Sequence, residues 1–145
     1  MTQADVADKA AFVRAALEGL ESLPQDSLES FLADPRNLPS ALHWMQTAIQ
    51  ALVDIGLIVV SARGLPTPRS SSEVLERLEE AGALPPDSSL RFRPIVGFRN
   101  RVVHLYDRID PEIVYRVLVE DRGDLVELLD LLLATVASLD PASDD

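Results

Sequence analysis

The sequence predicts an all-α protein, folded as an antiparallel bundle of four to six helices. Apolar residues recur at helical spacing along most of the chain, and the alternating pattern of a half-buried strand is absent. Prolines, glycines and short serine-rich stretches divide these periodic segments. With 145 residues, of which 47% are hydrophobic, the chain fits one domain with one core, expected over residues 1–145 with a short disordered acidic tail at the C-terminal end.

Two helices are predicted before the centre of the chain. The first covers residues 2–23, with Thr2 or Asp5 as the N-cap and a row of alanines and leucines at helical spacing. The second covers residues 26–33 and is short because a proline stands on either side of it.

The third predicted helix is the central one. It begins at Asn37 or Ser40 and ends near Ala62, where Gly64 and a nearby proline stop it. Between residues 49 and 60 it is apolar on nearly every face. Such a helix is contacted from several sides, so we expect it to lie in the middle of the bundle.

A Pro/Ser-rich loop over residues 64–72 leads to the last three predicted helices. They cover residues 73–81, 88–106 and 111–139. The second of these begins at Asp87 or Ser88, and we expect a kink at Pro94. In the third, a proline occupies the first position, and an interruption is expected near Gly123.

Charge and composition exclude several classes of function. A net charge of −11 opposes general binding to a polyanion, so we expect no DNA partner, although a local basic site remains compatible with it. With no cysteine and only two histidines, the chain lacks zinc-ligand spacing, and we expect no metal and no cofactor. Residues 1–9 do not resemble a secretory signal, and the apolar run 55–60 is far too short to cross a bilayer. We therefore expect a cytoplasmic protein without a membrane partner.

One segment reverses the sign of the charge. Residues 88–106 contain four arginines and no acidic residue. An arginine guanidinium presents a rigid fork of donors that matches phosphate oxygens. The alternative is that these arginines form surface ion pairs with the abundant carboxylates, and charge alone favours that interpretation by about two to one.

The order of residues within this segment points to a family. Residues 98–106 read Phe-Arg-Asn-Arg-Val-Val-His-Leu-Tyr, which resembles the R-x4-H-x-Y signature of the HepT-like toxins of the HEPN superfamily. The resemblance extends to Gly97 and through residues 107–115, and residues 48–59, with Asp54 among apolar neighbours, are similar to that family's central helix. It covers most of the domain, from about residue 42 to residue 133.

This resemblance implies a metal-independent endoribonuclease, the toxin of a toxin–antitoxin pair. His104 would be the general acid/base, and Arg99 would hold the scissile phosphate. Asn100, Arg101 and Asp54 would support the site. The implied partners are an RNA substrate, a second copy in a homodimer, and a nucleotidyltransferase antitoxin that silences the enzyme by adenylylating Tyr106.

Alternatives remain open at this stage. At about 100° per residue, His104 lies roughly 140° around the helix from Arg99. Either Arg99 reaches round on its long side chain, or the helix unwinds near Gly97, or the site is assembled in a dimer groove. Asp54 either pairs with a motif arginine or faces solvent at a gap in the bundle. Without the motif, His104 would be interpreted as a hydrogen-bonded histidine at a packed helix end.

Two other functions remain possible: a non-catalytic HEPN binding partner of a nucleotidyltransferase, and a purely structural helical dimer. The presence of Arg99, His104 and Tyr106 together favours the enzyme.

Overall fold

The chain folds into an all-helical bundle, which confirms the predicted fold class. The computed structural model describes residues 3–105 and 108–139. The helices are α1 (Gln3–Glu21), α2 (Leu28–Ala33), α3 (Asn37–Ala62), α4 (Ser71–Glu80), α5 (Ser88–Leu105), α6 (Pro111–Arg116) and α7 (Arg122–Leu139), and a π-helical segment, η2 (Val117–Asp121), joins the last two. Because α6, η2 and α7 follow one another without a gap, they form one long helix. The predicted C-terminal tail and Tyr106 lie outside the described residues.

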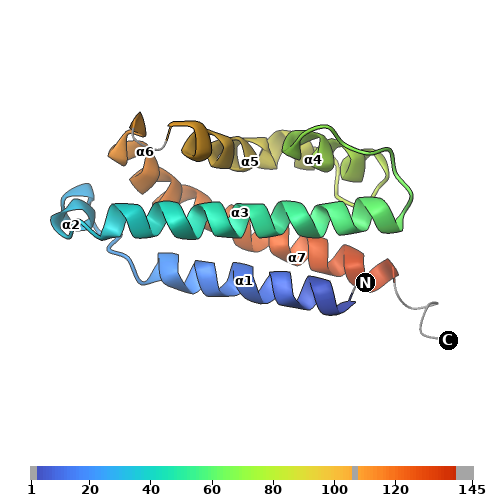
Figure 1. Cartoon of the computed structure of the whole chain (residues 1–145), viewed down its shortest axis with the longest axis horizontal. Helices are drawn as coiled ribbons and strands as arrows, with labels where there is room; N and C mark the ends of the chain where they lie inside the picture. The colour runs from blue at the N-terminus through green and yellow to red at the C-terminus, as the bar shows by residue number, and fades with distance from the viewer. Residues whose placement is uncertain (1–2, 106–107, 140–145) are drawn as a thin grey trace.

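Successive long helices run antiparallel, and α3 lies at the centre of the bundle. Figure 1 shows α3 through the middle of the molecule, with α1 on one side, α4 and α5 on the other, and α7 behind it. The short helices α2 and α6 lie together at one end of the bundle, and α1 begins and α7 ends at the other. The order of the elements is therefore that of an up-and-down bundle whose successive long helices return along the previous one.

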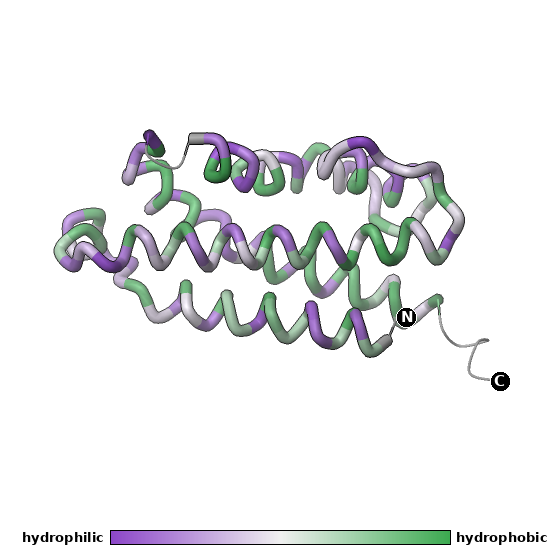
Figure 2. The backbone as a smooth tube through the Cα atoms, in the orientation of Figure 1, coloured by the Kyte–Doolittle hydropathy of each residue, from purple (hydrophilic) through white to green (hydrophobic). Residues whose placement is uncertain are grey.

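The central position predicted for α3 is confirmed. Twelve of its 26 residues are buried, among them Met45, Ile49, Leu52 and Ile55, and the hydrophobic colouring in Figure 2 is strong along its second half. By length and composition α3 would also suit a membrane span, but 56% of its apolar window is buried inside the bundle. Contact with helices on several sides explains why its hydrophobic residues occupy nearly every face.

Local signals place most helix ends close to the predicted positions. Ser70 caps α4 by accepting a hydrogen bond from the amide of Glu73 at 3.2 Å, and Asp110 caps α6 by accepting one from the amide of Glu112 at 2.9 Å. After α3, Gly64 adopts a φ of 65°, and the amide of Leu65 bonds back to the carbonyl of Val60. This is the left-handed helix ending that glycine favours.

One detail differs from the expectations. Pro94 stands inside α5, and the kink expected there stays a prediction. The interruption expected near Gly123 lies a few residues earlier and is a change of helix type, the π-helical η2, in which one turn holds an additional residue.

Candidate functional site

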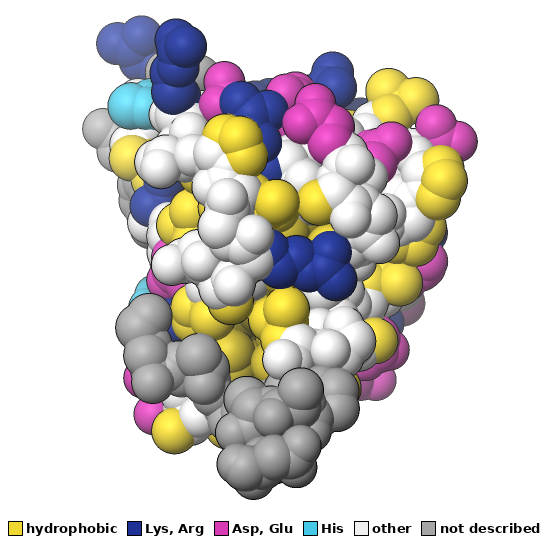
Figure 3. All heavy atoms as spheres, turned by 90° about the vertical axis from the view of Figure 1, so that its right-hand side faces the viewer, with side chains coloured by type: hydrophobic (Ala, Val, Ile, Leu, Met, Phe, Trp, Pro, Cys, Tyr) yellow, Lys and Arg dark blue, Asp and Glu magenta, His cyan; other side chains and the backbone are white. Residues whose placement is uncertain are grey.

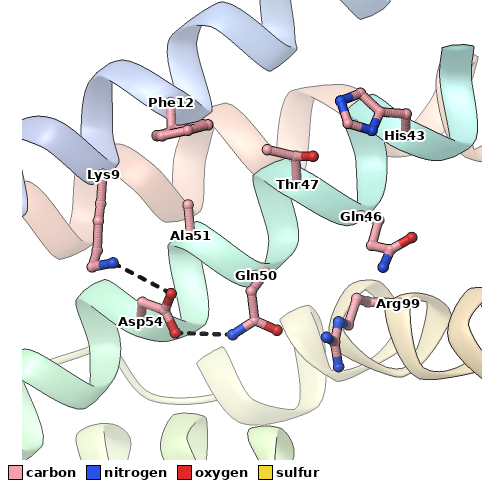
Figure 4. Close-up of a pocket in the computed structure, with 9 residues that line it drawn as sticks. All are labelled: Lys9, Phe12, His43, Gln46, Thr47, Gln50, Ala51, Asp54 and Arg99. Carbon is pink, nitrogen blue, oxygen red and sulfur yellow. Dashed lines mark hydrogen bonds and ion pairs between the residues drawn. The ribbon is translucent and has the colours of Figure 1, made fainter.

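A cleft of about 400 Å³ opens along α3, with α1 and α5 on its two sides. It is lined by Lys9 and Phe12 of α1, Arg99 of α5, and His43, Gln46, Thr47, Gln50, Ala51 and Asp54 of α3 (Figure 4). Residues three and four positions apart in a helix lie on one face, so the α3 side chains form a single stripe. The cleft is therefore a polar channel along the face of an otherwise apolar core helix.

Arg99 faces this cleft from α5. Its side chain is half-buried, and its Nε is buried without a hydrogen-bond partner in the part of the chain that the structure describes. None of the ion pairs among residues 3–105 and 108–139 includes it. A guanidinium consists only of donors, and a buried donor without an acceptor is costly. Arg99 therefore offers an unneutralised positive charge and free donors to an anion in the cleft.

Asp54 lies in the same cleft, but its carboxylate contacts Gln50 and Lys9 and does not pair with an arginine of the motif. Oδ1 accepts a hydrogen bond from Gln50 Nε2 at 2.9 Å, and Oδ2 lies 3.5 Å from Lys9 Nζ. Figure 4 shows both contacts as dashed lines, with Arg99 on the far side of Gln50. The side chains of Asp54 and Lys9 are about one-third exposed, so their ion pair contributes little to stability. The hydrogen bond from Gln50 to the same carboxylate fixes the orientation of the Gln50 amide.

The other described residues of the motif lie outside the cleft wall. His104, Asn100 and Arg101 are exposed on α5. The helix is unbroken at Gly97, so the idea that it unwinds there is wrong. His104 and Arg99 consequently diverge around α5 in the described chain, which leaves the reach of the Arg99 side chain and a site shared between two copies as explanations.

The other arginines of the segment differ from Arg99. Arg91 donates to Glu127 and Asp124 of α7, and these contacts raise the pKa of Arg91 and lower the pKa of Glu127. For Arg91 the ordinary ion-pair interpretation is therefore right. Arg93 is exposed. Viewed from one end, charged side chains of both signs gather along the edge of the bundle where α4 and α5 lie (Figure 3).

Sequence reasoning missed most of the cleft. His43 is exposed and lines the cleft, and its ring packs against that of Trp44. Lys9, Gln46 and Gln50 were not singled out. A usable signal was present, because polar residues at positions 43, 46, 47, 50 and 54 recur every three or four residues in a helix that is otherwise apolar.

Comparisons with known proteins agree with this architecture. Residues 13–132 match the family described as ribonuclease HepT-like. The tRNA nuclease HepT of Aphanizomenon flos-aquae (strain 2012/KM1/D3) is 28% identical over 102 residues, which cover 70% of this chain and 69% of that protein.

Two solved structures share the fold. One is the tri-AMPylated HEPN toxin of Shewanella oneidensis in complex with an MNT antitoxin, with a TM-score of 0.81 and 22% identity over 92% of this chain and 99% of the toxin. The other is a toxin–antitoxin structure with AMP-PNP, with a TM-score of 0.79 and 21% identity over 91% of this chain and 99% of that one. The helical arrangement around α3 is thus that of a known fold.

Proposed function

This chain belongs to the ribonuclease HepT-like family, and from that premise we propose that it is a metal-independent endoribonuclease, the toxin of a toxin–antitoxin pair. The observation that supports this most is Arg99, a half-buried guanidinium without a partner among the described residues, facing an open cleft. In a chain of net charge −11, such a group is a local site for a phosphate.

The chemistry follows from the residue types. The 2′-hydroxyl of the RNA attacks the adjacent phosphorus, the bond from phosphorus to the 5′-oxygen breaks, and a cyclic phosphate forms. One proton leaves the 2′-oxygen and one is delivered to the departing 5′-oxygen, and His104 performs one of these transfers because imidazole titrates near neutral pH. Arg99 stabilises the negative charge that grows on the phosphate oxygens.

We place the complete site between two copies of the chain. His104 is exposed, and its neighbour Val103 is an exposed apolar residue, 45% accessible, on the same helix. Arg99 and His104 diverge around α5 by roughly 140°, so one chain does not present both from one face. A homodimer that pairs its α5 helices would bring a second His104 toward the cleft that holds Arg99.

The partner proposed to silence this toxin is a nucleotidyltransferase. Two solved structures of this fold contain a toxin and an antitoxin, and one of them contains an AMPylated toxin with an MNT antitoxin. In the corresponding reaction here, the phenol oxygen of Tyr106 attacks the α-phosphorus of ATP, pyrophosphate leaves, and AMP remains on Tyr106. Added bulk and negative charge two residues from His104 would repel an RNA phosphate.

A cleavage assay in EDTA tests the enzymatic part. Purified chain, free of antitoxin, is incubated with tRNA and mRNA beside His104→Ala, Arg99→Gln and the control Arg93→Gln, which removes an exposed charge of the same helix. We expect cleavage by the wild type and by the control, and a loss of about 10²–10⁴-fold in the other two, with melting temperatures unchanged. An intact wild type that cleaves neither RNA class would instead support a non-catalytic partner of a nucleotidyltransferase.

The silencing step needs a separate test. Phenylalanine at Tyr106 removes the acceptor oxygen, so Tyr106→Phe should cleave RNA but gain no mass of AMP when incubated with antitoxin and ATP. Intact-mass spectrometry reads this directly. A Tyr106→Phe protein that still gains AMP and loses activity would show that another residue is modified.

A further inference from the structure

The amide of Gln50 has a fixed orientation in the cleft. An ionised carboxylate has acceptor oxygens and no donor, so the Gln50 atom that lies 2.9 Å from Asp54 Oδ1 is the nitrogen. The carbonyl oxygen of Gln50 consequently turns away from Asp54. In Figure 4 it lies on the side of the amide that faces Arg99.

An acceptor and a set of donors therefore face the same cleft. The Gln50 oxygen accepts no hydrogen bond from the residues that the structure describes, and the Arg99 guanidinium on the neighbouring helix has only donors to offer. A ligand that satisfies both groups needs an anionic group for Arg99 and, close to it, a hydrogen-bond donor for Gln50. A phosphate alone has the first and lacks the second.

RNA has both groups within one nucleotide unit. Its phosphodiester is the anion, and the ribose 2′-hydroxyl beside it is a donor that DNA does not possess. We infer that Gln50 is a specificity residue, which accepts a hydrogen bond from a ribose 2′-hydroxyl of the strand whose phosphate Arg99 holds, and so selects RNA over DNA. This rests on the proposed function, because it assigns a role in binding that same substrate.

Asp54 is then a positioning residue. Its carboxylate keeps the Gln50 nitrogen occupied, and Lys9 Nζ at 3.5 Å balances its charge. Asp54→Asn offers a donor as well as an acceptor to Gln50, so the amide is free to turn over. We expect this variant to lose part of the preference for RNA. Because the lost negative charge strengthens RNA and DNA binding by the same factor, the ratio of the two affinities is the quantity that reports the role of Asp54.

The test compares binding of two oligonucleotides. A single-stranded RNA and a DNA of the same sequence are titrated by fluorescence anisotropy at one fixed salt concentration, in a His104→Ala background that stops cleavage. Gln50→Leu keeps the size of the side chain and removes the acceptor. Its affinity for RNA should fall about five- to tenfold, the effect of one lost hydrogen bond, while its affinity for DNA stays within about twofold.

Two controls separate this effect from electrostatics and from misfolding. Lys9→Met removes a charge and should weaken RNA and DNA binding by the same factor. RNA with 2′-fluoro riboses cannot donate from the 2′ position, so the wild-type Gln50 protein should bind it about five- to tenfold more weakly than RNA. This second measurement tests the inference without any substitution at Gln50.

The outcomes are distinguishable. If the chain cleaves RNA but Gln50→Leu keeps the wild-type ratio of RNA to DNA affinity, or 2′-fluoro RNA binds like RNA, the inference is wrong and the proposed function stands. If the chain neither cleaves nor binds RNA, both are wrong.

Discussion

The close approach of α3 and α4 at Gly56 predicts the effect of one added methyl group. A Cβ at this buried position would lie 2.7 Å from Val74 Cγ1 and 3.4 Å from Leu78 Cδ1. Carbon atoms pack at about 3.5–4.0 Å, so Val74 would have to retreat by roughly 1 Å. Val74 is buried, and a β-branched residue in a helix has one preferred rotamer, so α4 itself must shift.

The free energy of unfolding of Gly56→Ala combines two opposing effects. Overpacking of this kind costs about 1–3 kcal/mol, and replacing a helical glycine by alanine returns about 1 kcal/mol. Gly123→Ala is the matched control, because nothing lies within 4 Å of its added Cβ and only the second effect applies. The helix preference cancels between the two variants, so Gly56→Ala should be less stable than Gly123→Ala by about 1–3 kcal/mol.

Thermal unfolding followed by circular dichroism measures this difference. At roughly 3 °C per kcal/mol for a chain of this length, the two melting temperatures should differ by about 3–9 °C, with Gly123→Ala above the wild type. Equal melting temperatures for the two variants would show that α3 and α4 do not pack closely at Gly56, and the reasoning would fail.

Three further predictions concern contacts that hold the helices in place. Two backbone amides at the start of α5 donate hydrogen bonds to the Glu79 carboxylate and lower the pKa of Glu79. The stability that ionised Glu79 contributes is therefore present at neutral pH and is lost as the pH falls through this lowered pKa. Glu79→Gln should be less stable than the wild type in urea at pH 7 and equal to it well below about pH 4. The hydroxyl of Tyr115 donates to the carbonyl of Gln25 at 2.7 Å, so Tyr115→Phe should lose about 0.5–1.5 kcal/mol in the same urea assay, and an unchanged midpoint would contradict that bond. Arg91→Met breaks exposed pairs to α7, so it should lower the free energy of unfolding only slightly, and high salt should reduce the loss. A loss independent of salt would argue against an electrostatic origin.

Much of the fold was predictable because helix boundaries depend on local signals. Helix ends at Ser70, Gly64 and Asp110 are set by a side-chain cap or by a left-handed backbone conformation within the adjacent turn. These ends can therefore be predicted without knowledge of the tertiary structure. The π-helical segment was not predictable in kind, because it depends on how α6 and α7 each pack on the rest of the bundle.

The candidate site was predictable only in part. The spacing of Arg99 and His104 pointed to the family, which the match over residues 13–132 confirms. Arg99 shares the cleft with Lys9 and Gln50, which come from two other helices that are far from α5 in the sequence. No local sequence pattern indicates that these three residues come together. The same limit applies to Arg91, whose sequence context resembles that of Arg99 but whose partners lie on α7.

The π-helical segment also determines how the two ends of the last helix are aligned. Its additional residue rotates everything before it by about 100° relative to an uninterrupted α-helix. Tyr115, on the far side of the segment, contacts Phe31 and Gln25 near α2, while Leu125 and Leu128 on the near side enter the core. Deleting the exposed residue Val119 would restore a regular α-helix through this segment. Tyr115 would then point away from α2, while α7 would keep its packing in the core. The π-helical segment therefore sets the rotation of α6 relative to α7, so that α6 packs against α2 while α7 packs into the core. A regular helix would not direct both sets of side chains correctly.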